Sequence, residues 1–433
     1  MPIFKRFIFF FVLTVAVSQD VADSLQVQLE AKGEWQSYYV GNEKSGFDFV
    51  SVDGEVDSLF FTGDQSIEPW VMQRLFRPIL GQSTTHRAMD QLRDVQDAYA
   101  FIDNHSILSF AKYDHNRVAA VVDFHPQFKS QIGGILGASK DKNGDWVTTG
   151  EIDLHMENAR RQGSIMDLKW QQPDPKTRTL VFAVETPFPF GLPFGTLVRY
   201  EQDFLEKSYI LESTSGMITG VGPFGRWTIG GKMEMGKDLE TDTRFESDAV
   251  ILGIKGDRRN NRWMPSKGRF WSFNYALGRV KDDGGDKRII EADFNLDRYK
   301  TFRWGTFRFL VHGDYTYMDG GKLPKSKKVK LGGANSVRGY YENQFMVDWA
   351  VINTIEWLFG NLDRSQLFLF VDSPVGRFGY DEGIIGIKKY FSLNPGYGMG
   401  FRQYNGTVTM DISVGFSKSS PGGKLHLKFS SDL

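Results

Sequence analysis

Hydrophobic and polar residues alternate along most of the chain after residue 128. The clearest case is the segment 407–416. One face of this segment would carry Val408, Met410, Ile412, Val414 and Phe416, and the other face Thr409, Asp411, Ser413 and Gly415. A period of two is the period of a β-strand, and one apolar face opposite a polar face is typical of strands in membrane barrels, where the outer surface meets lipid.

Similar segments, separated by turns rich in Gly, Asn, Asp and Pro, continue to the end of the chain. Their centres fall near residues 134, 150, 166, 181, 198, 210, 229, 251, 273, 293, 309, 352, 369, 400, 411 and 427, which gives sixteen strands. The number is even, as a closed antiparallel barrel requires. The sequence therefore predicts a mostly β fold, with a 16-stranded antiparallel transmembrane β-barrel over residues 129–433. The alternative, a soluble sandwich or propeller, leaves the outward aromatics and the amphipathic last strand unexplained.

Residues 53–128 follow the pattern of a compact α/β domain. A strand at 56–61 precedes a helix that Ser66 would cap, and a second helix begins at Thr84 or Thr85. The apolar stripes of the two helices are Ile67, Val71, Leu75 and Ile79, then Met89, Leu92, Val95, Tyr99 and Ile102. Strands at 107–113 and 118–124 complete the unit. An unrelated small α/β fold remains open from this pattern alone.

The first eighteen residues have the pattern of a secretory signal peptide. Lys5 and Arg6 precede an apolar stretch, and Ala16-Val17-Ser18 provides small residues for cleavage. The apolar stretch is too short for an anchor helix that spans a bilayer. We therefore expect a signal peptide at residues 1–18, followed by a linker or extension at residues 19–52.

Composition narrows the possible classes of protein. The chain has 433 residues, no Cys and a formal net charge of −1. The absence of Cys excludes a disulfide framework, a thiolate metal site and a Cys nucleophile. The near-neutral charge argues against a nucleic-acid binder, which needs a basic surface. The 46 Gly and 14 % aromatic residues suit many strands joined by tight turns.

Searches for catalytic patterns give no candidate. The string Gly220-Val-Gly-Pro-Phe-Gly225 matches G-x-G-x-x-G, but no helix pattern follows it to receive a phosphate, so we interpret it as a turn. The seven His residues show no i, i+3 or i+4 pairs, and no nucleophile elbow is present. We expect neither an enzyme, nor a metal site, nor a cofactor.

One long polar interval contains an arginine that would need a partner inside a barrel. Arg338 lies in the stretch Leu331-Gly-Gly-Ala-Asn-Ser-Val-Arg-Gly-Tyr340, where glycines permit tight turns and close approach to a wall. The alternative is that this stretch is a flexible surface loop without a functional role. The preceding basic run contains Lys322, Lys325, Lys327, Lys328 and Lys330. We interpret this run as a solvated loop on the outer face, with contact to anionic lipopolysaccharide as the alternative.

The residues of this interval resemble the signature loop of a known family. The matching positions are Gly332, Gly333, Ser336, Val337, Arg338, Gly339 and Tyr340. They resemble the loop of the BamA/TamA outer-membrane assembly and translocation superfamily, the bacterial surface antigen family. The resemblance implies that the loop folds back into the barrel and docks on its inner wall.

Further motifs occur in the order found in the family. Asp257-Arg258-Arg259 with Pro265 and Gly268 resembles its D-x-R…P-x-x-G hairpin, and Asn353 with Glu356 its N-x-x-E strand. Residues 368–372 resemble F-x-F-x-D, and residues 396–402 resemble G-x-G-x-G-x-R. The resemblance implies lumen partners for the loop at Glu356, Phe368, Phe370, Asp372, Arg402 and Asp411.

Two departures from the family pattern stand out. Ser373-Pro374 follows the aspartate strand where the family has a nearby Gly, so the turn there can differ. The chain ends on Leu433 rather than on an aromatic residue. The insertion signal would then be the pattern of Gly423, Leu425, Leu427 and Phe429.

The resemblance also covers the α/β domain, which is similar to a single POTRA domain, the periplasmic module of this superfamily. It implies an outer-membrane location, with function in assembling outer-membrane proteins or translocating a polypeptide across that membrane. The partners would be outer-membrane lipid and lipopolysaccharide, unfolded protein clients and periplasmic accessory proteins, with no nucleic acid. Strand-edge pairing and a weak seam between first and last strands would carry the mechanism. The alternative function is a passive porin-type channel for small solutes.

Overall fold

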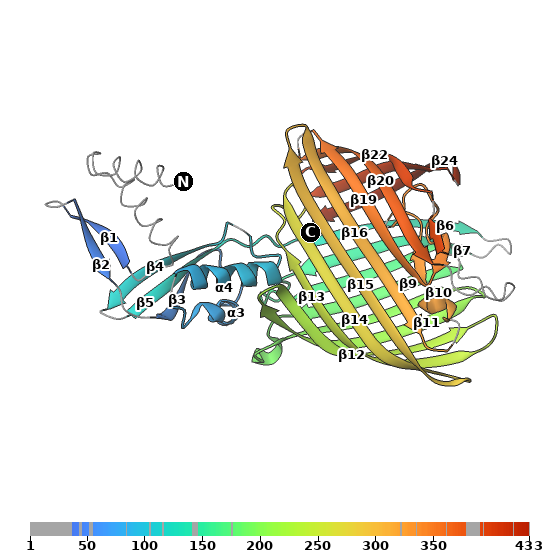
Figure 1. Ribbon diagram of the computed structural model, residues 1–433, viewed down its shortest axis with the longest axis horizontal. Coiled ribbons are helices and arrows are strands. Elements are labelled where there is room, and N and C mark those ends of the chain that lie inside the picture. The colour runs from blue at the N-terminus through green and yellow to red at the C-terminus, as the bar shows by residue number, and fades with distance from the viewer. Residues whose placement is uncertain are drawn as a thin grey trace. The chain divides into compact units, whose positions relative to one another are not determined.

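A computed structural model gives the architecture of the chain (Figure 1). The structure describes residues 37–42, 46–51, 55–83, 85–103, 105–114, 117–140, 146–174, 176–320, 323–334, 336–360, 362–377, 390–392, 394–418 and 420–432. The predicted signal peptide lies outside these residues. Within the predicted linker, β1 (Ser37–Asn42) and β2 (Gly46–Ser51) form an antiparallel hairpin.

The chain divides into two compact units, one of residues 1–95 and 102–126, the other of residues 96–101 and 127–433. The first unit contains a three-stranded sheet. In it β5 (Arg117–Phe124) lies between β3 (Val56–Gly63), which runs parallel to it, and β4 (Ile107–Asp114), which runs antiparallel. These strands match the predicted ones to within two residues at each end. No helix among the described residues is long and apolar enough to cross a bilayer.

The first helix of the unit is shorter than the sequence predicts. The α-helix α3 (Pro69–Leu75) is followed by a separate 3-10 turn, η1 (Arg77–Ile79), because Pro78 has no N–H with which to continue the helix. The predicted cap at Ser66 is also wrong. Glu68 is the N-cap, and the side chain of Asp64 instead accepts a hydrogen bond from the Ser66 N–H at 2.7 Å.

The apolar stripe of that helix is nevertheless correct. Its four members, Ile67, Val71, Leu75 and Ile79, are all buried. The second helix, α4 (Thr85–Ala98), begins at one of the two predicted threonines and buries Ala88, Leu92 and Val95. Spacing therefore identified the buried face, while the breaks in the helix depended on Pro78.

The second unit is an antiparallel barrel, and the predicted fold class is confirmed. Its sixteen long strands are β6 (Gln131–Lys140), β7 (Trp146–Glu157), β8 (Ile165–Asp174), β9 (Thr177–Thr186), β10 (Gly195–Leu205), β11 (Tyr209–Gly222), β12 (Gly225–Asp238), β13 (Arg244–Asp257), β14 (Gly268–Asp282), β15 (Gly285–Phe302), β16 (Gly305–Met318), β19 (Trp349–Phe359), β20 (Ser365–Arg377), β22 (Gly396–Tyr404), β23 (Val408–Ser417) and β24 (Ser420–Asp432). Each predicted centre lies within one of them. A short strand, β21 (Tyr390–Ser392), pairs with the end of β20.

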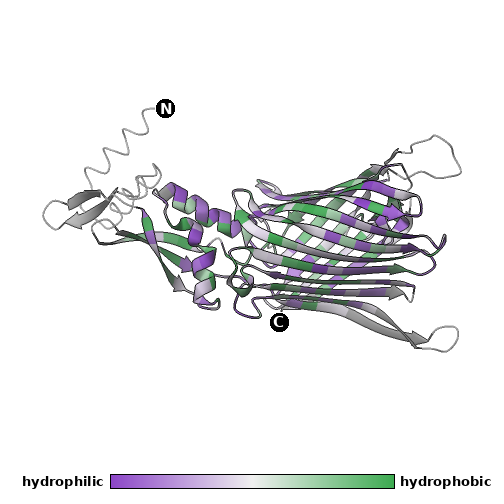
Figure 2. Cartoon of the chain, turned by 90° about the horizontal axis from the view of Figure 1, so that it is seen from below, coloured by the Kyte–Doolittle hydropathy of each residue, from purple (hydrophilic) through white to green (hydrophobic). Residues whose placement is uncertain are grey.

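The two faces of each strand differ as the alternation predicts, and Figure 2 shows hydrophobic and hydrophilic residues alternating along the barrel strands. On β20 the outward residues Leu367, Leu369 and Val371 are exposed, whereas Phe368 and Phe370 are buried inside. Exposed large apolar side chains recur on the other barrel strands. An apolar outer band of this kind is what a bilayer requires of a spanning barrel.

The seam between the last and first strands is short. Among the described residues, β24 and β6 share two residue pairs, Ser431 with Ile132 and Asp432 with Gln131. By contrast, β6 and β7 share ten pairs. Because each ladder pair contributes hydrogen bonds, this is the junction of the ring with the least backbone pairing to hold it closed.

Candidate functional site: the loop docked in the barrel lumen

The loop between β16 and β19 has a small fold of its own. Its strands β17 (Val329–Leu331) and β18 (Phe345–Val347) pair antiparallel. A hydrophobic cluster joins the loop to β19, and its buried members are Leu331, Val337, Tyr340, Val347, Ala350 and Ile352. Because this cluster and the paired strands fix its backbone, the loop is an ordered element rather than the flexible surface loop of the alternative interpretation.

Glycines let the loop pass close to the barrel wall. Gly339 has a φ of +93°, and a Cβ at this residue would lie 2.6 Å from the carbonyl oxygen of Phe416. On the wall itself, a Cβ at Gly396 would collide with the carbonyl oxygen of Arg338. The signature loop therefore packs closely against two strands, since a side chain at Gly396 would push it away from β22 and a side chain at Gly339 would push it away from β23.

Arg338 forms a multidentate ion pair with Asp372 of β20. Its Nε and Nη2 donate to the two carboxylate oxygens at 2.9 and 2.8 Å, and its backbone N–H donates to the same carboxylate at 3.0 Å. Thr354 of β19 donates a further hydrogen bond to Asp372 at 2.8 Å. The Asp372 side chain is buried, so these donors replace the water that the carboxylate has lost.

Glu356 of β19 lies at the centre of a second group of charges. It accepts from Arg338 Nη1 at 2.8 Å and from Arg308 Nη1 of β16 at 3.2 Å. Arg402 of β22 lies 3.9 Å from the same carboxylate and donates to Asp411 of β23 at 2.8 Å. The predicted lumen residues Asp372, Glu356, Arg402 and Asp411 thus come together in one network.

Two further members of the network were not predicted. Arg308 bridges Glu356 and Asp297 of β15, to which it donates at 2.9 and 3.0 Å. Thr354 was also missed. Each lies on the inward face of its strand, so strand parity together with polarity was a signal that could have found both residues.

The rings of the two predicted phenylalanines, Phe370 and Phe368, lie against the guanidinium groups of Arg338 and Arg402. The guanidinium carbon of Arg338 lies 3.5 Å from the ring centroid of Phe370, and that of Arg402 lies 5.0 Å from the centroid of Phe368. Such stacking adds a cation–π attraction to the ion pairs. A Cβ at Gly398 or Gly400 would collide with the wall and with these rings, which explains the glycine spacing of β22.

The basic run before the loop is not the solvated surface segment that the sequence predicts. Lys322 lies outside the described residues. The side chain of Lys327 is buried and pairs with Glu234 and Glu291, while Lys330 pairs with Asp203. The prediction was wrong for Lys327 and Lys330, because acidic residues of distant strands pair with them inside the barrel. Lys325 instead pairs with Glu240 in the turn after β12, where both side chains are partly exposed.

Two further segments that the sequence singled out lie in the hairpin between β13 and β14 and near the end of β20. In the hairpin between β13 and β14, Asp257 accepts from Arg259 at 2.9 and 2.6 Å. No turn occurs at Ser373-Pro374, because β20 continues to Arg377. Pro374 falls between the β22 and β21 pairings, where its missing N–H breaks no ladder hydrogen bond on that side.

The predicted insertion signal lies on the last strand. Leu425, Leu427 and Phe429 are exposed on the outer face of β24, and Gly423 precedes them on the same strand. Neighbouring β23 presents Phe416 outward with the same exposed fraction as Phe429, 41 %. Within the described part of the chain, no group of three or more His, Asp or Glu side chains is placed to hold a metal ion.

Comparison with known proteins identifies the fold. Residues 176–363 match the Omp85 superfamily domain. The structure is similar to CdiB from Escherichia coli, with 14 % identity, a TM-score of 0.60 and coverage of 95 % of this chain and 83 % of that one. CdiB from Acinetobacter baumannii gives 13 % identity and a TM-score of 0.57, covering 95 % and 81 %.

A further similar structure is BamA from Haemophilus ducreyi lacking POTRA domains 1-3. It shares 13 % identity at a TM-score of 0.50, covering 95 % of this chain and 92 % of that chain. No curated protein matches the sequence. At these identities the structures establish the fold alone. The domain match runs from β9 to the end of β19 and includes the docked loop with Arg338. Taken together, the domain match over residues 176–363 and the barrel fold support a relation of this chain to the Omp85 superfamily.

Proposed function

We propose that the protein assembles outer-membrane proteins or translocates a polypeptide across the outer membrane. The barrel would lie in that membrane and the α/β unit, as a POTRA-like domain, in the periplasm. The observation that carries the proposal is the seam of two residue pairs between β24 and β6. A seam held by so few hydrogen bonds can open at a lower free-energy cost than any fully paired junction.

An open seam would offer a client two strand edges. Backbone N–H and C=O groups of β6 and β24 that lack a partner strand form a template for β-augmentation. The α/β unit supports the same chemistry, because among the described strands β3 and β4 each pair with β5 alone. Its exposed apolar residues Phe60 and Ile107 lie on these two outer strands and would contact an extended client.

The competing function, a passive channel for small solutes, fits these features less well. A channel needs an open lumen, whereas here a folded loop is bonded to the inner wall through Arg338. A channel has no use for a short seam, which weakens the barrel without enlarging its lumen. The network of buried charges serves to hold the loop, so we assign the protein no enzymatic activity.

The test is a disulfide across the seam of this otherwise Cys-free chain. Ile132 and Ser431 are directly opposed, so the double substitution Ile132→Cys with Ser431→Cys places two thiols for a bridge. Oxidation should block complementation of a strain depleted of the protein, and a reducing agent should restore it. Client content of the outer membrane, or of the medium, provides the readout.

A second cysteine pair controls for the presence of a disulfide as such. Val184 and Val198 are opposed on β9 and β10, in a fully paired part of the barrel. Oxidation of Val184→Cys with Val198→Cys should leave function unchanged. Full function of the locked seam variant, with the disulfide formed, would contradict the proposal.

A further inference from the structure

The docked loop has a second attachment, made by two lysines that precede the signature motif. Lys327 Nζ donates to Glu291 of β15 at 2.7 Å and also pairs with Glu234 of β12. Lys330 Nζ pairs with Asp203 of β10. We call Lys327 and Lys330 the lysine anchor, and Arg338 the arginine anchor.

The contacts of the lysine anchor are buried or supported by further polar side chains. The Lys327 side chain is 3 % exposed and that of Glu234 5 %. Lys232 of β12 joins the same cluster, lying 3.1 Å from Glu234 and pairing with Glu291. At the second contact, Tyr209 donates its hydroxyl to Asp203 at 2.8 Å. Buried charges matched in this way leave an uncompensated partner when one is removed.

The Lys330 contact and the arginine anchor attach to opposite walls, whereas Lys327 contacts β12 and β15, which lie between these walls on one side of the ring. Asp203 lies on β10 and Asp372 on β20. Around the ring of long strands, seven lie between β10 and β20 in one direction, β11 to β16 and β19, and seven in the other, β22 to β24 and β6 to β9. The loop therefore spans the lumen from one side of the barrel to the other.

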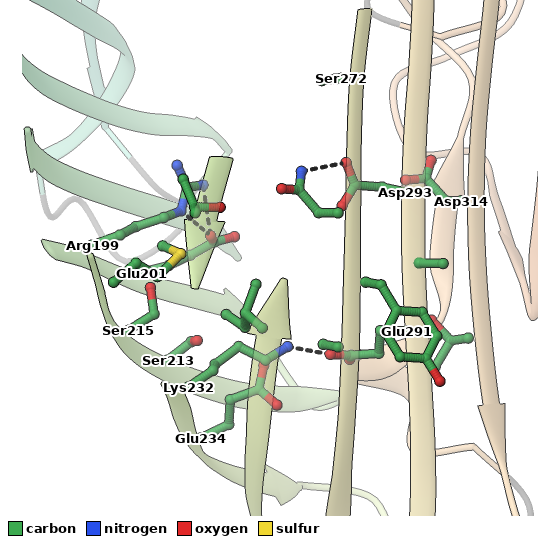
Figure 3. Close-up of a pocket in the computed structure, with 18 of the residues that line it drawn as sticks. Arg199, Glu201, Ser213, Ser215, Lys232, Glu234, Ser272, Glu291, Asp293 and Asp314 are labelled. Atoms are coloured by element: carbon green, nitrogen blue, oxygen red, sulfur yellow. Dashed lines mark hydrogen bonds and ion pairs between the residues drawn. The ribbon is translucent and has the colours of Figure 1, made fainter. Parts of the chain in front are cut away.

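A cavity of about 800 Å³ lies on the lysine side of this span (Figure 3). Residues 326–330 of the loop form part of its lining, and strands β9 to β16 form the rest. Figure 3 shows two ion pairs among the lining residues, one between Lys232 and Glu291 and one between Arg199 and Glu201. The lining combines charged side chains with apolar ones, and its charged groups can interact with water and ions. The lysine segment is one of its walls.

We propose that Lys327 and Lys330 are positioning residues that hold the loop across the lumen, and that release of this lysine anchor turns the cavity into an ion-conducting path. The arginine anchor, on the other wall, would keep the loop attached while the lysine side moves. This inference concerns the permeability of the lumen and does not depend on which client the protein serves.

Within the lysine anchor, the Lys330 contact is the one suited to release first. An ammonium group makes no planar bidentate contact, whereas the guanidinium of Arg338 binds Asp372 with two parallel bonds. Lys330 is also the more accessible cation, with a side chain 25 % exposed against 10 % for Arg338. Salt screens exposed pairs more than buried ones, so the Lys330 contact should weaken first.

The experiment measures the conductance of the purified full-length chain in planar lipid bilayers. Reversing one charge of the Lys330 contact, by Lys330→Asp or by Asp203→Lys, should raise the mean conductance severalfold. Combining the two substitutions restores opposite charges and should return the conductance to the wild-type value. At the buried contact, Lys327→Met should open the barrel, and Lys327→Arg should keep it closed.

The matched control is Lys281→Asp, which reverses the charge of an exposed lysine on β14 and should leave the conductance unchanged. If a charge-reversal variant does not insert, Lys330→Gln compared with Lys330→Arg gives the same test with smaller changes. Wild-type conductance in both Lys330→Gln and Lys327→Met would overturn the proposal. So would single variants that conduct while the double charge swap remains equally open.

Discussion

A guanidinium group, rather than an ammonium group, suits the position that Arg338 occupies. Three of its bonds go to two different carboxylates, and its planar face lies on the ring of Phe370. An ammonium group could approach one carboxylate at a time and could not stack in the same manner. The residue type is therefore fixed by the shape of the contact and not only by its charge.

We expect Arg338→Ala and Arg338→Lys to weaken docking of the loop while the barrel still forms. Exposed ion pairs contribute about 0–1 kcal/mol and broken buried pairs cost about 3–5 kcal/mol, and the burial of Asp372 places this pair toward the upper range. Asp372→Asn should have a similar effect. The measurement is urea unfolding in detergent micelles, followed by tryptophan fluorescence.

The double variant separates the ion pair from general destabilisation. Because Arg338 and Asp372 act on each other, the combined loss should be clearly smaller than the sum of the two single losses. Arg298→Ala, which removes an exposed arginine of β15, serves as the control and should change little. Additive losses for Arg338→Ala and Asp372→Asn would show that the two residues do not hold the loop together.

The position and partners of some functional residues could be predicted from the sequence, and those of others could not. Motif residues such as Asp372 and Glu356 could be named in advance, because the segments that contain them resemble motifs of the family. Lys327 could not be assigned correctly. Its partners Glu234 and Glu291 lie 93 and 36 residues away, and which strands face each other across a lumen depends on closure of the whole ring. Local periodicity carries no information about that distance.

Among the secondary-structure elements, β24 combines a lipid-facing surface with one edge of the seam. Its outward residues Leu425, Leu427 and Phe429 continue the apolar band, while two residue pairs near its end join β6. The strand must therefore be recognised and inserted although little pairing holds it to its second neighbour. We therefore predict that side chains, rather than backbone pairing, carry the insertion signal.

Phe429→Ala should reduce the amount of protein that reaches the outer membrane, whereas Phe429→Tyr should be tolerated because it keeps the aromatic ring. Phe416→Ala is the matched control, since Phe416 faces outward on β23 with an equal exposed fraction of 41 %. Quantitative immunoblotting of membrane fractions measures the effect. Equal losses for Phe416→Ala and Phe429→Ala would mean that any outward aromatic serves, and that the last strand carries no special signal.

The α/β unit should fold when expressed alone as residues 53–128, and its stability should depend on acid. Hydrogen bonds from His125 and Thr62, at 3.0 Å each, lower the pKa of Asp123 below its ordinary value of 3.8. A lowered carboxyl pKa adds stability that is present above pH 3.8 and is lost as the pH falls through the folded-state pKa.

Thermal unfolding of the isolated unit by circular dichroism, from pH 7 down to pH 2, measures this dependence. Asp123→Asn should lower the melting temperature at pH 7 and flatten the decline in acid. A wild-type unit without a cooperative transition would refute the domain assignment. A variant with the same decline as wild type would show that other carboxylates are responsible.

For the whole molecule, the order and number of strands follow from the sequence to a large extent. All sixteen predicted centres lie in barrel strands, because alternation over a dozen residues is a strong signal and glycine-rich turns separate the segments. The sequence predicted only that the seam is weak and gave no length for it, since pairing between residues 299 to 301 positions apart leaves no local pattern. The lumen-spanning loop is likewise a property of the closed ring, which brings Asp203 and Asp372 to opposite walls.

Depletion of the protein, followed by quantitative proteomics of the outer membrane and of the culture medium, tests the central claim most directly. The account predicts the loss of one or more barrel proteins from the membrane, or of a secreted protein from the medium. Wild-type protein should restore the loss and Arg338→Ala should restore it poorly. Unchanged protein content of both fractions, combined with slower uptake of small solutes, would contradict assembly and translocation and would support the passive channel.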